Sequence, residues 1–110
     1  NDIELIVINT PRPNFDLVTY GEEYYTLYLW AKEFFAENGA RYYDFNLAKP
    51  EVFKSQPDYF FNFEHLNYLG AEAFSKAFAE FMVRLEQGDN VEDDFYNWQE
   101  YIESVDFIYE

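Results

Sequence analysis

The hydrophobic positions of the first fifty residues follow a strand pattern, then a helix pattern, then a strand pattern again. Ile3–Ile8 is almost continuously apolar and mostly β-branched, which is typical of a strand buried on both faces. Apolar residues recur at helical spacing over Glu22–Glu37, and Asn38–Gly39 supplies a common helix stop. Arg41–Leu47 predicts a second strand. A strand–helix–strand unit with short links favours a parallel pair.

The second half of the chain predicts a long loop and further helices. Ala48–Asn67 contains two prolines and no sustained period, which indicates a loop of a length that often carries function. An amphipathic helix is expected over Tyr68–Gln87, with Asn67 as its N-cap. A weaker helix is expected near Glu92–Glu103, followed by a short terminal strand over Val105–Tyr109.

Two sets of apolar positions are expected to face the core. On the first helix they are Tyr24, Leu27, Ala31, Phe34 and Phe35. On the second helix they are Ala71, Phe74, Phe78, Phe81, Met82 and Leu85. Residues at these spacings share one side of a helix, so both helices are predicted to cover a sheet. The elements together predict one α/β domain over residues 1–110, with a short parallel sheet and flanking helices.

Composition and charge narrow the classes of partner. The chain is 49% hydrophobic and 24% aromatic, far more than disordered acidic segments contain. Its net charge of −15 repels phosphate backbones, so we expect no nucleic-acid partner. No apolar run is long enough to predict insertion into a membrane. The absence of cysteine excludes disulfides, thiolate metal sites and a cysteine nucleophile.

The residues with most chemical potential surround the single histidine, His65. It lies at the end of the long loop, within the segment NFEHLNYLGA, immediately before the second helix. Imidazole is the side chain that titrates near neutral pH, so a histidine placed on such a loop can serve as a general base.

The His-Leu-Asn segment, a Gly-Ala pair and the amphipathic helix after them resemble the last block of the SGNH (GDSL-type) hydrolases. The DltD-like group of cell-surface acyltransferases and esterases is the most similar. The resemblance covers residues 3–87 and leaves 88–110 as an acidic C-terminal extension. It implies part of a flavodoxin-like three-layer fold, a serine ester hydrolase or O-acyltransferase activity, an acylated carbohydrate or small ester as substrate, and an extracytoplasmic setting.

The resemblance also implies roles for individual residues. His65 matches the general base, and Asn62 occupies the position of the triad aspartate. Asn67 matches the asparagine of the His-Leu-Asn segment, where it would cap the following helix. Asp58 is an alternative acid if the loop folds back. No cofactor or metal is expected, because the oxygen-rich segment at 89–94 lacks the alternation and glycine of a calcium loop.

The chain departs from the family in two ways. It has no Gly-Asp-Ser block, and neither Ser75 nor Ser104 lies at a strand-to-helix turn, which leaves Ser55 as the one conceivable local nucleophile. In addition, an asparagine cannot stabilise the imidazolium as the triad aspartate does. We therefore expect this segment to be inactive alone and to require a serine from elsewhere. The alternative is a non-catalytic binding or self-associating domain on a hydrolase-like scaffold.

The short sheet also predicts self-association. Two or three parallel strands leave an unpaired edge, and such an edge can pair with a strand of another chain. We therefore expect a homodimer or a higher oligomer, formed by strand pairing or by swapping.

Overall fold

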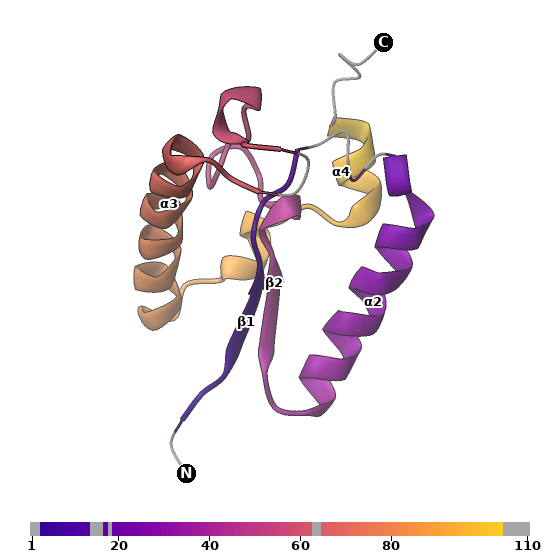
Figure 1. Ribbon diagram of the computed structural model, residues 1–110. Helices are drawn as coiled ribbons and strands as arrows, with labels where there is room; N and C mark the ends of the chain where they lie inside the picture. Colours follow the sequence, from indigo (N-terminus) through magenta and orange to yellow (C-terminus); the bar gives the residue numbers. More distant parts are fainter. Residues whose placement is uncertain (1–2, 14–16, 18, 63–64, 105–110) are drawn as a thin grey trace.

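The computed structural model describes residues 3–13, 17, 19–62 and 65–104 (Figure 1). Within them the chain has an α/β fold with a two-stranded parallel sheet and three helices. The strands are β1 (Ile6–Asn9) and β2 (Arg41–Asp44), and the helices are α2 (Glu22–Glu37), α3 (Tyr68–Glu86) and α4 (Trp98–Ser104). Short 3-10 turns cover Phe45–Leu47, Pro57–Tyr59 and Val91–Asp94. In Figure 1, α2 and α3 lie on opposite sides of the sheet.

The parallel pairing of the strands confirms the prediction from the strand–helix–strand pattern. Ile6 pairs with Arg41 and Asn9 with Asp44, so both strands run in the same direction and end together. The expectation that the first strand is Ile3–Ile8 and buried on both faces is wrong. β1 begins only at Ile6 and is half-buried, and Leu5 before it is 58% exposed. Among the described residues β1 pairs with β2 alone, so its side chains lie at an edge of the sheet and are only partly covered.

Helix α2 has the predicted bounds, but part of its predicted core face lies in solvent. Its end is fixed by Gly39 at φ +76, a conformation that glycine adopts without strain. Ala31 is buried, whereas Leu27 is 59% and Phe34 is 42% exposed. The sheet is too narrow to lie under this whole side of the helix. Leu27, Trp30 and Phe34 therefore form an apolar strip on α2 that the described residues leave exposed.

The second strand is shorter than predicted. It ends at Asp44 rather than Leu47, because the Asp44 carboxylate accepts a hydrogen bond from the backbone N–H of Asn46 and turns the chain. The residues Phe45–Leu47 then form a 3-10 turn that is completely buried. Phe45 enters the main core, and Leu47 enters a smaller cluster beneath α4.

Helix α3 supplies the main core through the predicted stripe. Phe74 and Phe81 are buried, and Phe78, Met82 and Leu85 pack against them. The remaining predicted position of the stripe, Ala71 in the first turn of the helix, is exposed instead. The predicted N-cap is confirmed, since the side chain of Asn67 accepts a hydrogen bond from the backbone N–H of Gly70 at 2.9 Å.

The predicted helix over Glu92–Glu103 is wrong, because the chain forms two separate pieces there. The 3-10 turn Val91–Asp94 is followed by an extended stretch, in which Phe95 bridges Ala48 and Tyr96 donates to Leu47. Helix α4 begins only after Asn97. Asn97 and Glu100 exchange side-chain-to-backbone hydrogen bonds of 2.8 and 2.9 Å, which is a capping box.

The acidic segment after α3 packs against the domain. Val91 and Tyr101 are each 4% exposed and belong to the two core clusters. The expected terminal strand over Val105–Tyr109 lies outside the described residues. A search of the described helices for one long and apolar enough to span a bilayer finds no candidate.

Candidate functional site

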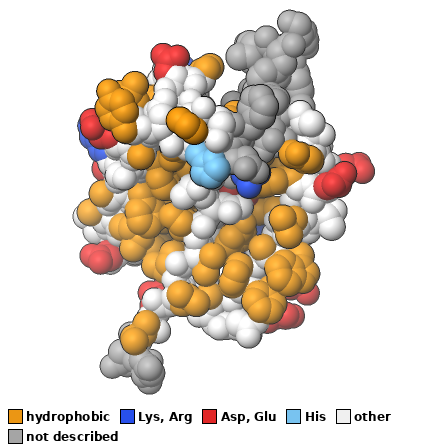
Figure 2. Space-filling model, viewed as in Figure 1, with side chains coloured by type: hydrophobic (Ala, Val, Ile, Leu, Met, Phe, Trp, Pro, Cys, Tyr) orange, Lys and Arg blue, Asp and Glu red, His pale blue; other side chains and the backbone are white. Residues whose placement is uncertain are grey.

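Residues 60–62 and 65–66 form the two arms of the His65 hairpin, which lie at the end of the molecule where the strands finish (Figure 1). Phe60 and Leu66 form an antiparallel bridge, and the backbone N–H of Phe61 donates to the carbonyl of His65 at 2.8 Å. This pairing makes Phe61 the cross-strand neighbour of His65. The imidazole is exposed, as Figure 2 shows, so its ring is open to a substrate or to another segment.

Asn62 holds the histidine through two contacts made by one oxygen. Its Oδ1 lies 3.0 Å from the backbone nitrogen of His65 and 2.9 Å from the ring Nδ1. A backbone N–H can only donate, so this atom is the amide oxygen and accepts. Nδ1 must therefore carry the proton to donate to the same oxygen. The neutral ring then presents its Nε2 lone pair outward, which is the tautomer a general base requires.

Asn67 joins this hairpin to the start of α3. Besides capping the helix, its side-chain amide donates to the carbonyl of Asp58 at 2.6 Å, and its backbone N–H donates to the carbonyl of Tyr59 at 2.8 Å. Gly70, in the first turn of α3, is buried directly against Tyr59. These contacts tie the base of the His65 hairpin to a long helix that is anchored in the core.

The other predicted site residues are not brought to the histidine. Asp58 is exposed in the 3-10 turn Pro57–Tyr59, and among the described residues no hydrogen bond or ion pair links its carboxylate to His65. Ser55 is half-buried and makes no hydrogen bond to the ring within the same residues. Ser75 is exposed on α3, and the hydroxyl of Ser104 donates to the carbonyl of Tyr101. The described part of the chain therefore places no serine against His65.

Exposed apolar side chains flank the histidine in the sequence. Phe61 and Tyr68 are each 78% exposed, and Leu69 is 47% exposed. Figure 2 shows hydrophobic side chains beside the imidazole on this face. Such groups favour contact with an apolar partner over contact with water.

A buried polar cluster at the carboxyl ends of the two strands was not predicted from the sequence. Asp44 is 3% exposed and accepts hydrogen bonds from the hydroxyl of Tyr24 and from Asn46. The side chain of Asn46 reaches the loop after β1, where its Oδ1 accepts from the backbone N–H of Arg12 at 2.7 Å. Asn9, at the end of β1, donates to the Tyr24 hydroxyl at 3.3 Å. The cluster therefore joins α2, both strands and the following loop.

Burial sets the electrostatics of this cluster. It raises the pKa of the Asp44 carboxyl above its usual range, although the hydrogen bonds from Tyr24 and Asn46 oppose that rise. Burial and the charge of Asp44 also raise the pKa of the Tyr24 phenol. The phenol therefore keeps its proton and donates a hydrogen bond to the carboxylate.

The raised pKa of Asp44 predicts a pH-dependent contribution to stability. When the pKa of a carboxyl is higher in the folded than in the unfolded state, the group stabilises the fold most at a pH below its unfolded pKa of about 3.9. This stabilisation is lost as the pH rises through the folded pKa. The Asp44→Asn variant lacks this ionisation. We expect urea denaturation to show the variant gaining stability relative to the wild type as the pH rises from 4 to 8. A difference in the free energy of unfolding between the variant and the wild type that stays the same from pH 4 to 8 would contradict a raised pKa of Asp44.

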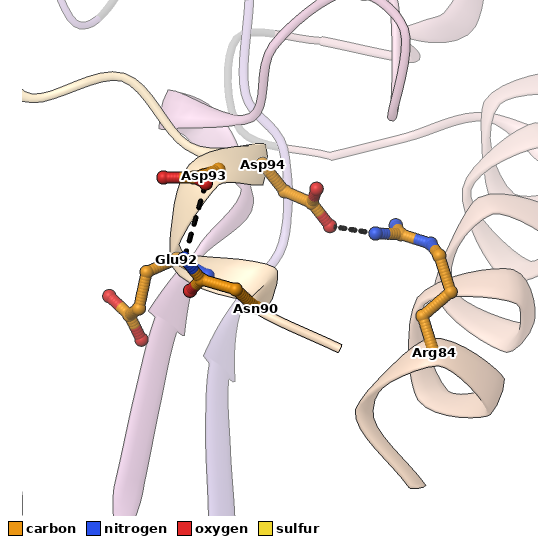
Figure 3. Close-up of polar contacts among 5 residues, drawn as sticks. All are labelled: Arg84, Asn90, Glu92, Asp93 and Asp94. Carbon is orange, nitrogen blue, oxygen red and sulfur yellow. Dashed lines mark hydrogen bonds and ion pairs between the residues drawn. The ribbon is translucent and has the colours of Figure 1, made fainter. Parts of the chain in front are cut away.

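The acidic turn after α3 does not form a metal site in the described residues. Figure 3 shows Asp94 pointing to Arg84, Asn90 beside Asp93, and Glu92 directed away from both pairs. The side-chain amide of Asn90 donates a hydrogen bond of 3.2 Å to the carboxylate of Asp93. The contact between Arg84 and Asp94 is an ion pair at a half-buried position. Within the described ranges, no three acidic, histidine or cysteine side chains gather as they would around a metal ion.

A cavity of about 350 Å³ lies beside β2, away from the histidine. It is bounded by Tyr28 and Lys32 of α2, by Arg41 and Tyr42 of β2, and by Phe95. His65 does not line it, so the cavity and the imidazole are separate features.

Comparison of the chain with protein-family models, with curated proteins and with solved structures gives no match.

Proposed function

We propose that this chain is the histidine-bearing part of an SGNH-like ester hydrolase or O-acyltransferase. In this proposal His65 is the general base, Asn62 orients it, and the nucleophilic serine comes from a segment outside these 110 residues. The fold is then the C-terminal part of a flavodoxin-like domain. The substrate class is an acylated carbohydrate or another small ester, and the setting is extracytoplasmic.

The observation that supports this proposal most strongly is the double contact of Asn62 with His65. The shared Oδ1 fixes both the position of the ring and the tautomer that leaves Nε2 free. Parallel strands that end on the same side of the molecule as this hairpin are a second support, because functional groups gather at the carboxyl edge of such sheets (Figure 1).

The asparagine limits what the pair can do. An amide oxygen orients the imidazole, but it carries no charge to stabilise the imidazolium that forms when a serine is deprotonated. The aspartate-to-asparagine exchange in a serine protease triad lowers the rate by about 10⁴-fold. We therefore expect slow turnover, and we expect Asn62→Asp to accelerate the reaction of the assembled enzyme.

The test uses the whole open reading frame that contains these residues. A fluorophosphonate probe is expected to label a serine in a Gly-Asp-Ser segment, and His65→Ala should slow the labelling by a factor of about 10³ or more. Thr26→Ala, at an exposed position of α2, serves as the control and should label normally. A reading frame without such a serine, or labelling that is unaffected by His65→Ala, would refute the proposal.

A non-catalytic binding domain is the second candidate. The apolar strip on α2 favours it, since the rings of Trp30 and Phe34 stack at 5.0 Å between centroids and both are exposed. Aromatic surfaces of this kind are frequent at contacts with partners. Assays of the product of the whole open reading frame with short-chain esters, using His65→Ala as control, separate the candidates, because activity that depends on His65 would exclude a purely binding role.

A further inference from the structure

The edge of β1 that faces away from β2 is open to pairing with another strand. Within the described residues the sheet has two strands, and β1 has β2 as its one neighbour. The backbone N–H of Arg41 donates to the carbonyl of Leu5, which fixes the phase of the parallel ladder. Residues alternate in such a ladder, so the N–H and C=O groups of Ile6 and Ile8 point away from β2. Among the described residues nothing pairs with these groups.

Apolar side chains continue from this edge onto α2. Val7 pairs with Tyr42, whose ring packs against Tyr28 and Phe35, so Val7 and Leu5 face the α2 side of the sheet. On α2, the apolar strip of Leu27, Trp30 and Phe34 adjoins the buried side of the helix. Together with Leu5 it forms an open apolar face, in which the exposed fractions are 58% for Leu5, 59% for Leu27, 58% for Trp30 and 42% for Phe34.

The other side of the sheet is apolar at the same edge. Ile6 and Ile8 pack on the core cluster that α3 supplies. Figure 2 shows hydrophobic side chains over the lower part of α2 and also between α3 and the sheet, on one face of the molecule. A strand added beside β1 would therefore be covered on both sides, which is the environment of a strand inside an α/β sheet.

We infer that β1 pairs with β1 of a second copy of this chain, antiparallel about a two-fold axis at Val7, to form a four-stranded sheet. The edge is complementary to itself. With Val7 opposite Val7 of the second copy, Ile6 lies opposite Ile8, and each such pair exchanges two N–H···O=C bonds. The axis is perpendicular to the sheet, so both copies of α2 lie on the same face and their apolar strips meet.

The exposed apolar side chains supply more than half of the area that a stable dimer buries. Four large side chains that are about half exposed contribute on the order of 500 Å² per copy, and the paired backbone adds to this. Stable interfaces bury about 800 Å² per partner. The chain's charge of −15 opposes association, so the dimer should tighten as salt screens the repulsion.

The first test is the mass of the chain in solution. Light scattering at micromolar concentration should give twice the 13.3 kDa of the chain, with tighter association at 0.5 M than at 0.05 M salt. The double variant Leu27→Lys/Trp30→Lys should weaken the dimer at least tenfold. Val83→Lys, at a position of α3 that is 54% exposed, is the matched control and should leave the mass unchanged. A monomer at every concentration, or a dimer that salt weakens, would overturn the inference.

The second test reads the register directly. The chain has no cysteine, so a single one reports on its own neighbours. Directly opposed residues of a non-hydrogen-bonded antiparallel pair lie about 4.5 Å apart at Cα, within the range for a disulfide. Val7→Cys should therefore form a cross-linked dimer under mild oxidation, and Val83→Cys should not. A dimer in which Val7→Cys does not cross-link would place the interface elsewhere and refute the proposed pairing.

Discussion

Gly70→Ala will destabilise the chain by roughly 3 kcal/mol, although alanine is normally the better helix residue. A Cβ at this position would lie 2.2 Å from the carbonyl oxygen of Tyr59 and 2.8 Å from Cδ2 of Leu66. The first of these is a backbone atom that also accepts the hydrogen bond from Asn67. Removing the clash means moving the start of α3 away from the turn at Pro57–Tyr59, which breaks the contacts that hold the His65 hairpin.

Urea denaturation measures this loss, with Ser75→Ala as the control on the same helix. Ser75 is exposed, so that exchange should change the free energy of unfolding by less than about 0.5 kcal/mol. The Gly70→Ala variant should also lose the ordered environment of His65, visible in the ring resonances of its NMR spectrum. A Gly70→Ala chain as stable as the wild type would contradict the close approach of α3 to the Tyr59 backbone.

Phe81→Ala will have the largest effect on stability, about 3–5 kcal/mol. Phe81 is completely buried, and its ring meets Tyr43 at 5.0 Å and Phe45 at 5.1 Å between centroids. It also contacts Phe95 from the segment after α3. Removing the ring leaves a cavity between β2, α3 and the C-terminal segment, which together form most of the core.

The stability lost in Phe81→Ala is a large part of the total free energy of unfolding. Domains of this size are stable by about 5–15 kcal/mol, so Phe81→Ala should leave a large fraction of the chain unfolded at modest urea concentrations. Val83→Ala on the exposed side of α3 is the control and should be nearly neutral. Equal unfolding midpoints for the two variants would contradict the position of Phe81 at the centre of the core.

The local parts of the fold were predictable from the sequence. The bounds of α2, the cap at Asn67 and the parallel strand pair each follow from a short-range signal that tertiary contacts do not oppose. The helical period of α2 gave the shared side of Leu27 and Phe34 but not their exposure. Periodicity states which residues lie together, whereas burial depends on how wide the sheet beneath them is.

Two errors came from side chains that compete with regular structure. Asp44 ends β2 by accepting a hydrogen bond from the backbone N–H of Asn46. In the sequence Asp44 lies within a run of aromatic residues, and that run predicts a longer strand. The tail was expected as one helix, although Asn97 and Glu100 show the spacing of a capping box and so mark a helix start. Both signals are present in the printed sequence.

The candidate site was predictable only in part. His65 and Asn62 lie together because they are three residues apart in one hairpin, so local spacing was sufficient. The cluster of Asp44 with Tyr24 was not foreseen, because the two residues are 20 positions apart and meet only after α2 packs on the sheet. Polar residues at the end of the second strand were the available signal, since the carboxyl edges of parallel strands attract such groups.

Asn62 holds His65 so that the Nε2 lone pair of the ring is directed outward. Long-range ¹H–¹⁵N correlation NMR of the imidazole at pH 8 tests it most directly. We expect a proton on Nδ1 and none on Nε2 in the wild type, with the same tautomer in Asn62→Asp and a mixture of tautomers in Asn62→Ala. A wild-type ring that carries its proton on Nε2 would contradict this role of Asn62.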